Sequence, residues 1–343
     1  MLAEHTRLIL VAQPGAGKTT RVPLMLLSSA WAQGQRLLLV EPRRVAARLA
    51  ATFMASQLNE QIGETVGYRM RGDSNVGPNT RLEVVTQGVL TRILQDDPLL
   101  EGVAGIIFDE FHERSIEADL GLALALDVQE SIRDDLRLMV MSATLDVAAL
   151  KGVLGSDTPV IESSGREFSV ETRYCPVEAH ESLDRAALRV TKEALKREGS
   201  RDVLVILPGI AEISQLVQAL ESSSMDVEIR ALHGSMPLDA QQAALRPLTT
   251  RQRVIVSTAI AESSVTVDGV NSVIDAGLER VPLFNPRTGL TRLMTRRVNR
   301  ASADQRRGRA GGSADAERSA CRGDPLDWRD DGRSNRHPPQ LRP

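Results

Sequence analysis

The stretch Ala12–Thr20 reads AQPGAGKTT; it follows the apolar run Arg7–Val11 and precedes the mostly apolar segment Arg21–Leu27. This order predicts a strand, a glycine-containing loop and a helix. Gly15 and Gly17 would let the backbone turn so that its N–H groups point at a phosphate, and the start of the helix would add its positive end. The stretch therefore predicts a phosphate-binding loop at the end of the first strand of an α/β sheet.

Two side chains of this loop would carry the nucleotide chemistry. Lys18 would reach the β- and γ-phosphate oxygens, and the hydroxyl of Thr19 would ligate magnesium. The pattern G-x-x-x-x-G-K-[ST] has glycine where this chain has Ala12, so the pattern is missed by one position. The alternative is a glycine-rich turn that only closes a strand–helix unit, but the Gly-Lys-Thr sequence between strand and helix favours phosphate binding.

The composition is that of an ordinary globular protein. A chain of 343 residues predicts about two domains, and 42% hydrophobic with 25% charged residues is typical of a soluble protein. The net charge of −3 means that any nucleic-acid site must be a local groove. Cys175 and Cys321 are the only cysteines, which excludes a disulfide scaffold. With neither an 18-residue apolar run nor a signal peptide, the sequence predicts a cytoplasmic protein.

The next strand predicts a second set of ligand-facing residues. The apolar segment Arg36–Val40 is followed by EPRRVAA, which places Arg43 and Arg44 at a carboxyl edge, where α/β sheets bind ligands. Two solvated arginines that open a helix are the alternative. Thr86 ends the strand predicted over 81–86, where it could contact a sugar or phosphate or could cap the helix that starts at Gln87.

The stretch Gly105–Arg114, GIIFDEFHER, predicts a strand that delivers two carboxylates to its carboxyl end, as in a Walker B element. Asp109 would hold the magnesium ion, and Glu110 would orient an attacking water or accept its proton. A zinc site at His112 and Glu113 is disfavoured because no second histidine follows at helical spacing. The strand over 137–141 then leads into Ser-Ala-Thr at 142–144, which reads locally as a helix N-cap.

The segment Val160–Tyr174 is predicted to link two domains, because a second α/β pattern follows it. The predicted helices are Ser182–Glu198, one that ends near Ser222, and Asp239–Leu248, and the predicted strands are Asp202–Leu207, Val227–Leu232, Arg253–Thr258 and Ser272–Gly277. This half has no Gly-Lys loop, so two similar sheets could close on one nucleotide. Phe284–Thr291 predicts a hairpin or extended turn, and Asp304–Gly311 predicts an arginine-rich loop that can reach a γ-phosphate across the cleft.

Taken together, the motifs resemble those of the DEAH-box superfamily 2 helicases, and most of all the bacterial HrpB-type ATP-dependent helicases. The matching stretches are AQPGAGKTT, EPRRVAA, VTQGVL, DEFHER, SAT, VLVILPGIAEI, LHGSMP, VSTAIAESSVTVDGV and QRRGRAG, which span Leu8 to Gly311. The family tolerates alanine at the position of Ala12. The resemblance implies two tandem RecA-like parallel-sheet domains, at 1–164 and 165–311, that form an α/β P-loop NTPase helicase core.

The resemblance also implies a function and a set of site residues. The expected protein is a monomer that uses ATP and magnesium to move 3′ to 5′ on single-stranded RNA or DNA. The nucleotide would be held by Gly15, Ala16, Gly17, Lys18, Thr19, Thr20 and Asp109, with Thr19 and Asp109 on the metal. Hydrolysis would use Glu110, with Gln305 and Arg309 reaching in from the second domain.

Further residues would connect the nucleotide to the nucleic acid. Coupling of the nucleotide state to domain closure would use His112, Ser142 and Thr144, although His112 could instead be a hydrogen-bonded structural histidine. Contacts to the nucleic acid would be made by Arg43, Arg44, Thr86 and Thr258. These residues would lie along the sugar-phosphate backbone of a single-stranded nucleic acid and would bind it without reading its base sequence.

Two other classes of function remain. One is an ATP-gated nucleic-acid-binding module without efficient turnover. The other is a P-loop kinase or GTPase, which is disfavoured because a second sheet with its own motifs has no use there.

The family pattern breaks at position 312. The last motif should read Q-R-x-G-R-x-G-R, whose final arginine would be a second finger, but this chain has Gly312. Loss of this arginine should impair hydrolysis. Residues 312–343 contain Leu326, Trp328 and Leu341 as their only large apolar residues, so we expect this tail to be disordered. A reading-frame change after Gly311 would explain the break, and a natural flexible terminus is the alternative.

Overall fold

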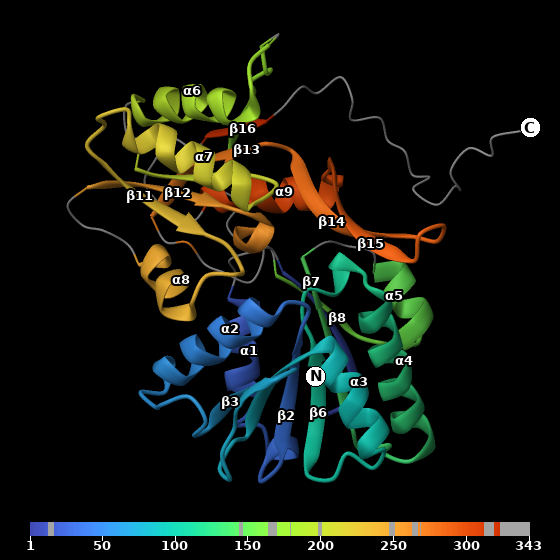
Figure 1. Cartoon of the computed structure of the whole chain (residues 1–343). Helices are drawn as coiled ribbons and strands as arrows, with labels where there is room; N and C mark the ends of the chain where they lie inside the picture. Colours follow the sequence, from blue (N-terminus) through green and yellow to red (C-terminus); the bar gives the residue numbers. More distant parts are fainter. Residues whose placement is uncertain are drawn as a thin grey trace, which may run out of the picture.

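The computed structural model shows two α/β units built on separate sheets (Figure 1). It describes residues 1–12, 17–143, 147–163, 170–178, 180–197, 201–246, 251–262, 267, 269–311 and 319–322. In Figure 1 the N-terminal half, coloured blue to green, faces the C-terminal half, coloured yellow to red.

The first sheet has eight strands in the order β4-β3-β5-β2-β6-β7-β1-β8. Its strands are β1 (Arg7–Ala12), β2 (Arg36–Glu41), β3 (Val66–Met70), β4 (Asp73–Asn75), β5 (Leu82–Thr86), β6 (Val103–Phe108), β7 (Arg137–Ser142) and β8 (Val160–Ser163). Only the pair β3–β4 is antiparallel among these strands. The central strands are apolar runs because both faces of a parallel sheet are covered.

Helices cover both faces of this sheet. The helices α1 (Lys18–Leu26) and α2 (Arg44–Gln57) contribute to the apolar cluster on one face, together with Leu37 and Leu39 of β2. On the other face, Leu38 and Val40 pack in the cluster that contains residues of α3 (Gln87–Asp96), α4 (Ile116–Ser131) and α5 (Val147–Leu154). The period of two along β2 thus sends alternate residues to opposite cores.

The second sheet has six parallel strands in the order β11-β12-β10-β13-β16-β9. Its strands are β9 (Glu171–Tyr174), β10 (Asp202–Ile206), β11 (Val227–Leu232), β12 (Gln252–Ser257), β13 (Val270–Asp275) and β16 (Ser319–Arg322). One apolar cluster holds side chains of α6 (Leu183–Leu195) and α7 (Ile210–Glu221), and a second holds Ala244 and Leu245 of α8 (Leu238–Leu245). The predicted α/β pattern of the second half is confirmed.

The predicted hairpin is confirmed and is longer than its turn suggested. Strand β14 (Leu278–Asn285) pairs antiparallel with β15 (Leu290–Arg297). Gly289 lies in the turn at φ 65°, a left-handed conformation that favours glycine. Figure 1 shows the hairpin projecting from the second half.

Two predictions about irregular segments are wrong in part. The segment Val160–Tyr174 is not only a link, because its ends form β8 of the first sheet and β9 of the second. The segment Asp304–Gly311 is not a loop: it comprises the second half of α9 (Arg300–Gly308) and a 3-10 turn. Asn299 caps α9 by accepting a hydrogen bond from the Ser302 N–H at 2.8 Å, which favours the helix.

The tail predicted to be disordered contains one described exception. Residues 319–322 form β16, which pairs with β13 on one side and β9 on the other. Backbone pairing at this position covers β13, which would otherwise be the sheet edge, and attaches β9 as the outermost strand; such pairing does not require an apolar sequence. The remainder of 312–343 and the Ser-Ala-Thr cap at Thr144 lie outside the described residues. Within the described part of the chain, every helix is too short or too polar to cross a membrane.

Candidate nucleotide site and domain interface

The carboxyl ends of β2 and β6 and the start of α1 bring the candidate nucleotide residues together. Gly17 caps α1 in a left-handed conformation with φ 78°, where a side chain would be strained. The loop residues Gly15 and Ala16 lie outside the described residues. Thr20 is half-buried in the first turn of α1, and its N–H donates to the Gly17 carbonyl at 3.3 Å.

Lys18 and Thr19 both face the carboxylates at the end of β6. The Nζ of Lys18 lies 3.1 Å from Oε2 of Glu110 and 4.0 Å from Oδ1 of Asp109, with all three side chains buried. The hydroxyl of Thr19 donates a short hydrogen bond to Oδ2 of Asp109. The structure thus juxtaposes four residues that the sequence assigned to nucleotide chemistry.

The cluster carries more negative than positive charge in a buried position. Burial, followed by the neighbouring charge of Glu110, raises the pKa of Asp109 to about 6, while Lys18 and Thr19 oppose this rise. The same surroundings, with burial as the largest cause, raise the pKa of Glu41 well above its usual range. A site of this kind favours an additional cation.

The donor set of Thr19 and Asp109 fits a magnesium ion. Hydroxyl and carboxylate oxygens are hard ligands, and magnesium is usually bound through one or two carboxylates, several waters and substrate phosphates. Among the described residues no group of three or more histidine, cysteine, aspartate or glutamate side chains could hold a metal by itself.

Glu110 has a strained backbone. Its φ of 48° and ψ of 36° place a non-glycine residue in the left-handed region. Its N–H donates to Oδ1 of the preceding Asp109 at 2.7 Å, which helps to hold the turn. Strain of this kind is concentrated at functional sites, where the surrounding structure fixes one geometry.

His112 contacts three parts of the site. Its Nδ1 accepts a hydrogen bond from the Ala143 N–H at 3.2 Å, and its Nε2 lies 3.4 Å from Oε2 of Glu110. The same Nε2 makes a short contact with the side-chain amide of Gln305, from α9 in the second half. Burial is the main cause that lowers the pKa of His112, which favours the neutral imidazole. Ser142 is buried at the end of β7, next to Ala143.

Arg309 lies near the cluster but is held by a backbone carbonyl. Its Nε and Nη2 donate to the Glu262 carbonyl at 2.9 and 2.7 Å. Burial lowers the pKa of Arg309, and the negative charges of Glu110 and Glu262 oppose this effect. The guanidinium of the second half is therefore within electrostatic reach of Glu110 in the first half.

The four nucleic-acid candidates have different environments. Arg43 donates to the Ala259 carbonyl at 2.7 Å and pairs with Glu113 at 3.1 Å, so it joins the two halves of the chain. Arg44 is exposed at the start of α2. Thr86 and Thr258 are half-buried N-caps of α3 and of the 3-10 turn after β12, without side-chain capping hydrogen bonds.

Sequence reasoning missed a buried ion network beside Arg309. Arg306 is 0% exposed and donates through Nε to Glu262 at 2.9 Å and through Nη1 to Asp275 at 2.8 Å. The position of Arg306 between the predicted site residues Gln305 and Arg309 could have indicated its burial, since residues of one motif often share an environment. Glu41 was also missed, because an acid at a strand end reads as a polar turn.

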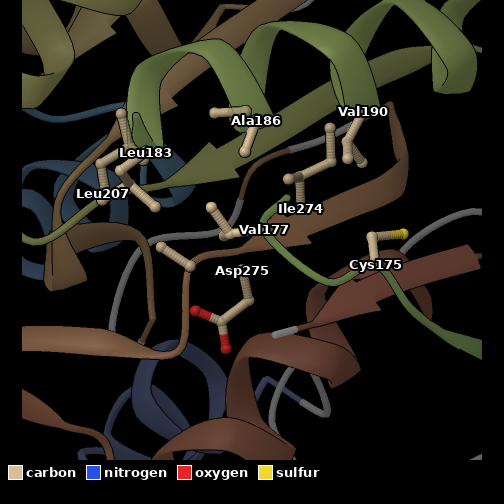
Figure 2. Close-up of a pocket in the computed structure, with 10 residues that line it drawn as sticks. Cys175, Val177, Leu183, Ala186, Val190, Leu207, Ile274 and Asp275 are labelled. Atoms are coloured by element: carbon tan, nitrogen blue, oxygen red, sulfur yellow. The ribbon is translucent and has the colours of Figure 1, made fainter. Parts of the chain in front are cut away.

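A small cavity in the second half is separate from this cluster. It has a volume of about 50 Å³ and is lined mainly by apolar side chains, including Leu183 and Val190 of α6 and Ile274 of β13 (Figure 2). Figure 2 shows the Asp275 carboxylate at its edge, pointing away from the apolar groups and consistent with its bond to Arg306. The cavity is a packing defect large enough for one or two water molecules.

Comparisons with known proteins agree with this arrangement. The model of the DEAD/DEAH box helicase family matches residues 1–152, and that of the helicase conserved C-terminal domain matches residues 186–313. The ATP-dependent RNA helicase HrpB of Escherichia coli (strain K12) is 51% identical over 307 residues, which are 89% of this chain and 38% of that protein. An ATP-dependent RNA helicase HrpA homolog of Haemophilus influenzae is 33% identical over 313 residues, or 91% of this chain and 24% of that protein.

Solved structures show the same fold. Two crystal structures of E. coli HrpB, described as a DEAH/RHA helicase and as a DExH-box NTPase, match with TM-scores of 0.86 and 0.80. Both are 48% identical to this chain and are matched over 93% of it, but over only 40% and 39% of their own lengths. The chain thus spans less than half of these relatives. The two family models, the sequence identity and the shared fold together show that this chain belongs to the DEAD/DEAH-box helicases, with similarity to HrpB.

Proposed function

We propose that this chain is the ATP-driven core of a nucleic-acid helicase, with domains at 1–164 and 165–311. The observation that carries the proposal is the buried cluster of Lys18, Thr19, Asp109 and Glu110, which meets Gln305 of the second domain through His112. A phosphate-binding lysine, a metal-binding pair and a carboxylate for water are the parts that ATP hydrolysis needs.

Each residue then has a role in the reaction. Lys18 neutralises the β- and γ-phosphate oxygens, and Thr19 and Asp109 hold the magnesium ion, which supplies charge stabilisation to the transferring phosphoryl group. Glu110 orients the attacking water and accepts its proton. Once Arg309 leaves the Glu262 carbonyl, its guanidinium stabilises the charge that develops on the γ-phosphate.

The nucleic acid is proposed to be a single strand of RNA or DNA, along which the protein moves 3′ to 5′. The exposed Arg44 is the side chain that is best placed for a phosphate contact. The ion pair and carbonyl contact of Arg43 support an interdomain role for it. We further propose that the protein is a cytoplasmic monomer. RNA is favoured because the similar proteins are described as RNA helicases.

A second candidate is an ATP-gated binding module without efficient turnover. Gly312 at the position of the second finger and the engagement of Arg309 by a backbone carbonyl favour it. Multiple-turnover ATPase measured alone, with single-stranded RNA and with single-stranded DNA separates the two. Stimulated turnover supports the helicase core, whereas nucleotide-dependent nucleic-acid binding without turnover supports the module.

Two variants test the assignment of residues. Lys18→Ala should strongly weaken binding of magnesium ATP, because the site loses the cation that contacts the phosphates. Glu110→Gln should retain binding and lose hydrolysis, since its carboxylate acts on water. Lys196→Ala, an exposed lysine at the end of α6, is the matched control and should change neither property. Equal loss of binding in Lys18→Ala and Glu110→Gln would refute this division of roles.

A further inference from the structure

Glu41, the last residue of β2, is a buried carboxylate without a hydrogen-bond partner in the part of the chain that the structure describes. The residue is 0% exposed, and neither carboxylate oxygen has a hydrogen-bond partner among the described residues. Removing an ionised carboxylate from water without a partner is strongly unfavourable, whereas an apolar side chain of similar length would suit a buried position. The fold by itself therefore gives no reason for an acid at this position.

Strand geometry directs Glu41 to the phosphate-binding side of the sheet. Leu39, two residues earlier on β2, packs in the apolar cluster formed with α1 and α2, and Glu41 lies on the same face. Lys18 is the first residue of α1. The Asp109 N–H donates to the Val40 carbonyl at 3.0 Å, so Glu41 and Asp109 end adjacent strands at the same level.

The charges around Glu41 are those of the candidate nucleotide site. After burial, the negative charges of Asp109, Glu110 and Glu113 raise the pKa of Glu41 further, while Lys18 lowers it. These groups are close enough to influence Glu41. The acids of the described chain do not, however, form a group that could hold a metal ion by themselves. Thr19 and Asp109 already contact each other as the candidate ligand pair, so we assign Glu41 to the water molecules around the ion.

We propose that Glu41 is a positioning residue that accepts hydrogen bonds from water molecules bound to the magnesium ion of the nucleotide. This inference rests on the proposed ATP-binding function. Magnesium loses water reluctantly and keeps several water ligands, whose protons need acceptors. The two unpartnered oxygens of Glu41 supply such acceptors beside the ligand pair Thr19 and Asp109. Loss of an outer-shell partner of this kind typically weakens metal binding about 10–100-fold.

Metal affinity, measured without turnover, tests the proposal. The full chain is mixed with a non-hydrolysable ATP analogue and Mn²⁺, and free Mn²⁺ is followed by electron paramagnetic resonance. In Glu41→Met, which removes both acceptors, and Glu41→Gln, which removes the charge, the Mn²⁺ dissociation constant should rise about 10-fold or more. Affinity for the analogue in the presence of a chelator should stay near the wild-type value. Without nucleotide, both variants should melt at or above the wild-type temperature.

A second buried glutamate provides the control. Glu83 of β5 is 1% exposed, but Arg69 donates to it at 2.6 Å and Arg36 at 3.4 Å. Glu83→Gln should lower the melting temperature and leave Mn²⁺ affinity unchanged, because this carboxylate has structural partners. A structural role for Glu41 would instead give both Glu41 variants the behaviour of Glu83→Gln.

The outcomes separate this inference from the proposed function. If the wild-type chain does not bind Mn²⁺ with the ATP analogue, the proposed function fails and the role of Glu41 fails with it. If the wild type binds and Glu41→Met binds Mn²⁺ equally well, only the role of Glu41 is overturned. Failure of both Glu41 variants to fold also contradicts the inference, because a residue that acts only on the water around the metal ion is not needed for the unliganded protein to fold.

Discussion

Replacement of Arg306 by alanine should destabilise the second domain and release Arg309 from its present contact. The Arg306 guanidinium is fully buried between Glu262 and Asp275, at 2.9 and 2.8 Å, and also donates to the Leu278 carbonyl at 3.2 Å. Arg306→Ala leaves two buried carboxylates without their cation. Breaking a buried ion pair in this way costs about 3–5 kcal/mol.

This loss is large enough to measure by thermal unfolding. At about 2–4 °C per kcal/mol for domains of 150–250 residues, the melting temperature should fall by roughly 6–20 °C. Circular dichroism in the far ultraviolet follows the unfolding, and limited proteolysis identifies which half opens first. Arg307→Ala is the matched control. The Arg307 side chain is half exposed, and its Nη2 lies 3.8 Å from Oδ1 of Asp304, so we expect the free energy of unfolding to change by no more than about 0.5 kcal/mol.

The ion network also positions the backbone of Glu262. Arg306 donates to the Glu262 side chain, and the Glu262 carbonyl accepts hydrogen bonds from Nε and Nη2 of Arg309. The variant Arg306→Ala should therefore lose nucleotide turnover at temperatures where it is still folded. Equal melting temperatures for Arg306→Ala and Arg307→Ala would refute the stabilising role of the ion pairs that Arg306 makes with Glu262 and Asp275.

Three further predictions concern the interface and the nucleic acid. Arg44→Ala should reduce the slope of log affinity against log salt for single-stranded RNA by about 1, whereas Arg43→Ala should leave this slope unchanged because Arg43 already contacts Glu113 and a carbonyl. Titration of fluorescent RNA at several salt concentrations measures both. His112→Ala should retain ATP binding but lose stimulation of the ATPase by nucleic acid, and equal stimulation would contradict a coupling role. Gly312→Arg should raise turnover, since an arginine finger contributes about 10³–10⁵ in rate in other systems, and wild-type rates already equal to those of an intact relative would refute this expectation.

The sequence predicted the fold well because the strands of both sheets are buried on two faces. A buried parallel strand such as β6 reads as a continuous apolar run, and the helices between such runs supply the crossovers. The Gly-Lys-Thr stretch and the Asp-Glu pair follow β1 and β6, so the parallel direction of these strands places both at the same edge of the sheet, with β7 between the two strands. Local pattern and topology agreed at these positions.

The sequence could not predict which polar side chains are buried. Arg43 finds its carbonyl partner 216 residues away, and Gln305 meets His112 across 193 residues. Contacts over such separations depend on how the two sheets face each other, which no local pattern encodes. Glu41 and Arg306 look like surface charges for the same reason, because their burial comes from neighbouring strands and turns.

The position of Lys18 suggests how nucleotide chemistry could reach the second domain. Lys18 lies 3.1 Å from Glu110, and Glu110 lies 3.4 Å from the His112 imidazole, which contacts Gln305. A phosphate that draws Lys18 toward itself competes with Glu110 for the same positive charge. We expect Glu110 then to interact more strongly with the neighbouring imidazole, whose Nε2 lies 3.4 Å from its Oε2. Because the buried His112 imidazole has its Nε2 beside both Glu110 and Gln305, we expect a change in its contact with Glu110 to alter its contact with Gln305, which would carry the effect of the γ-phosphate charge to the domain interface.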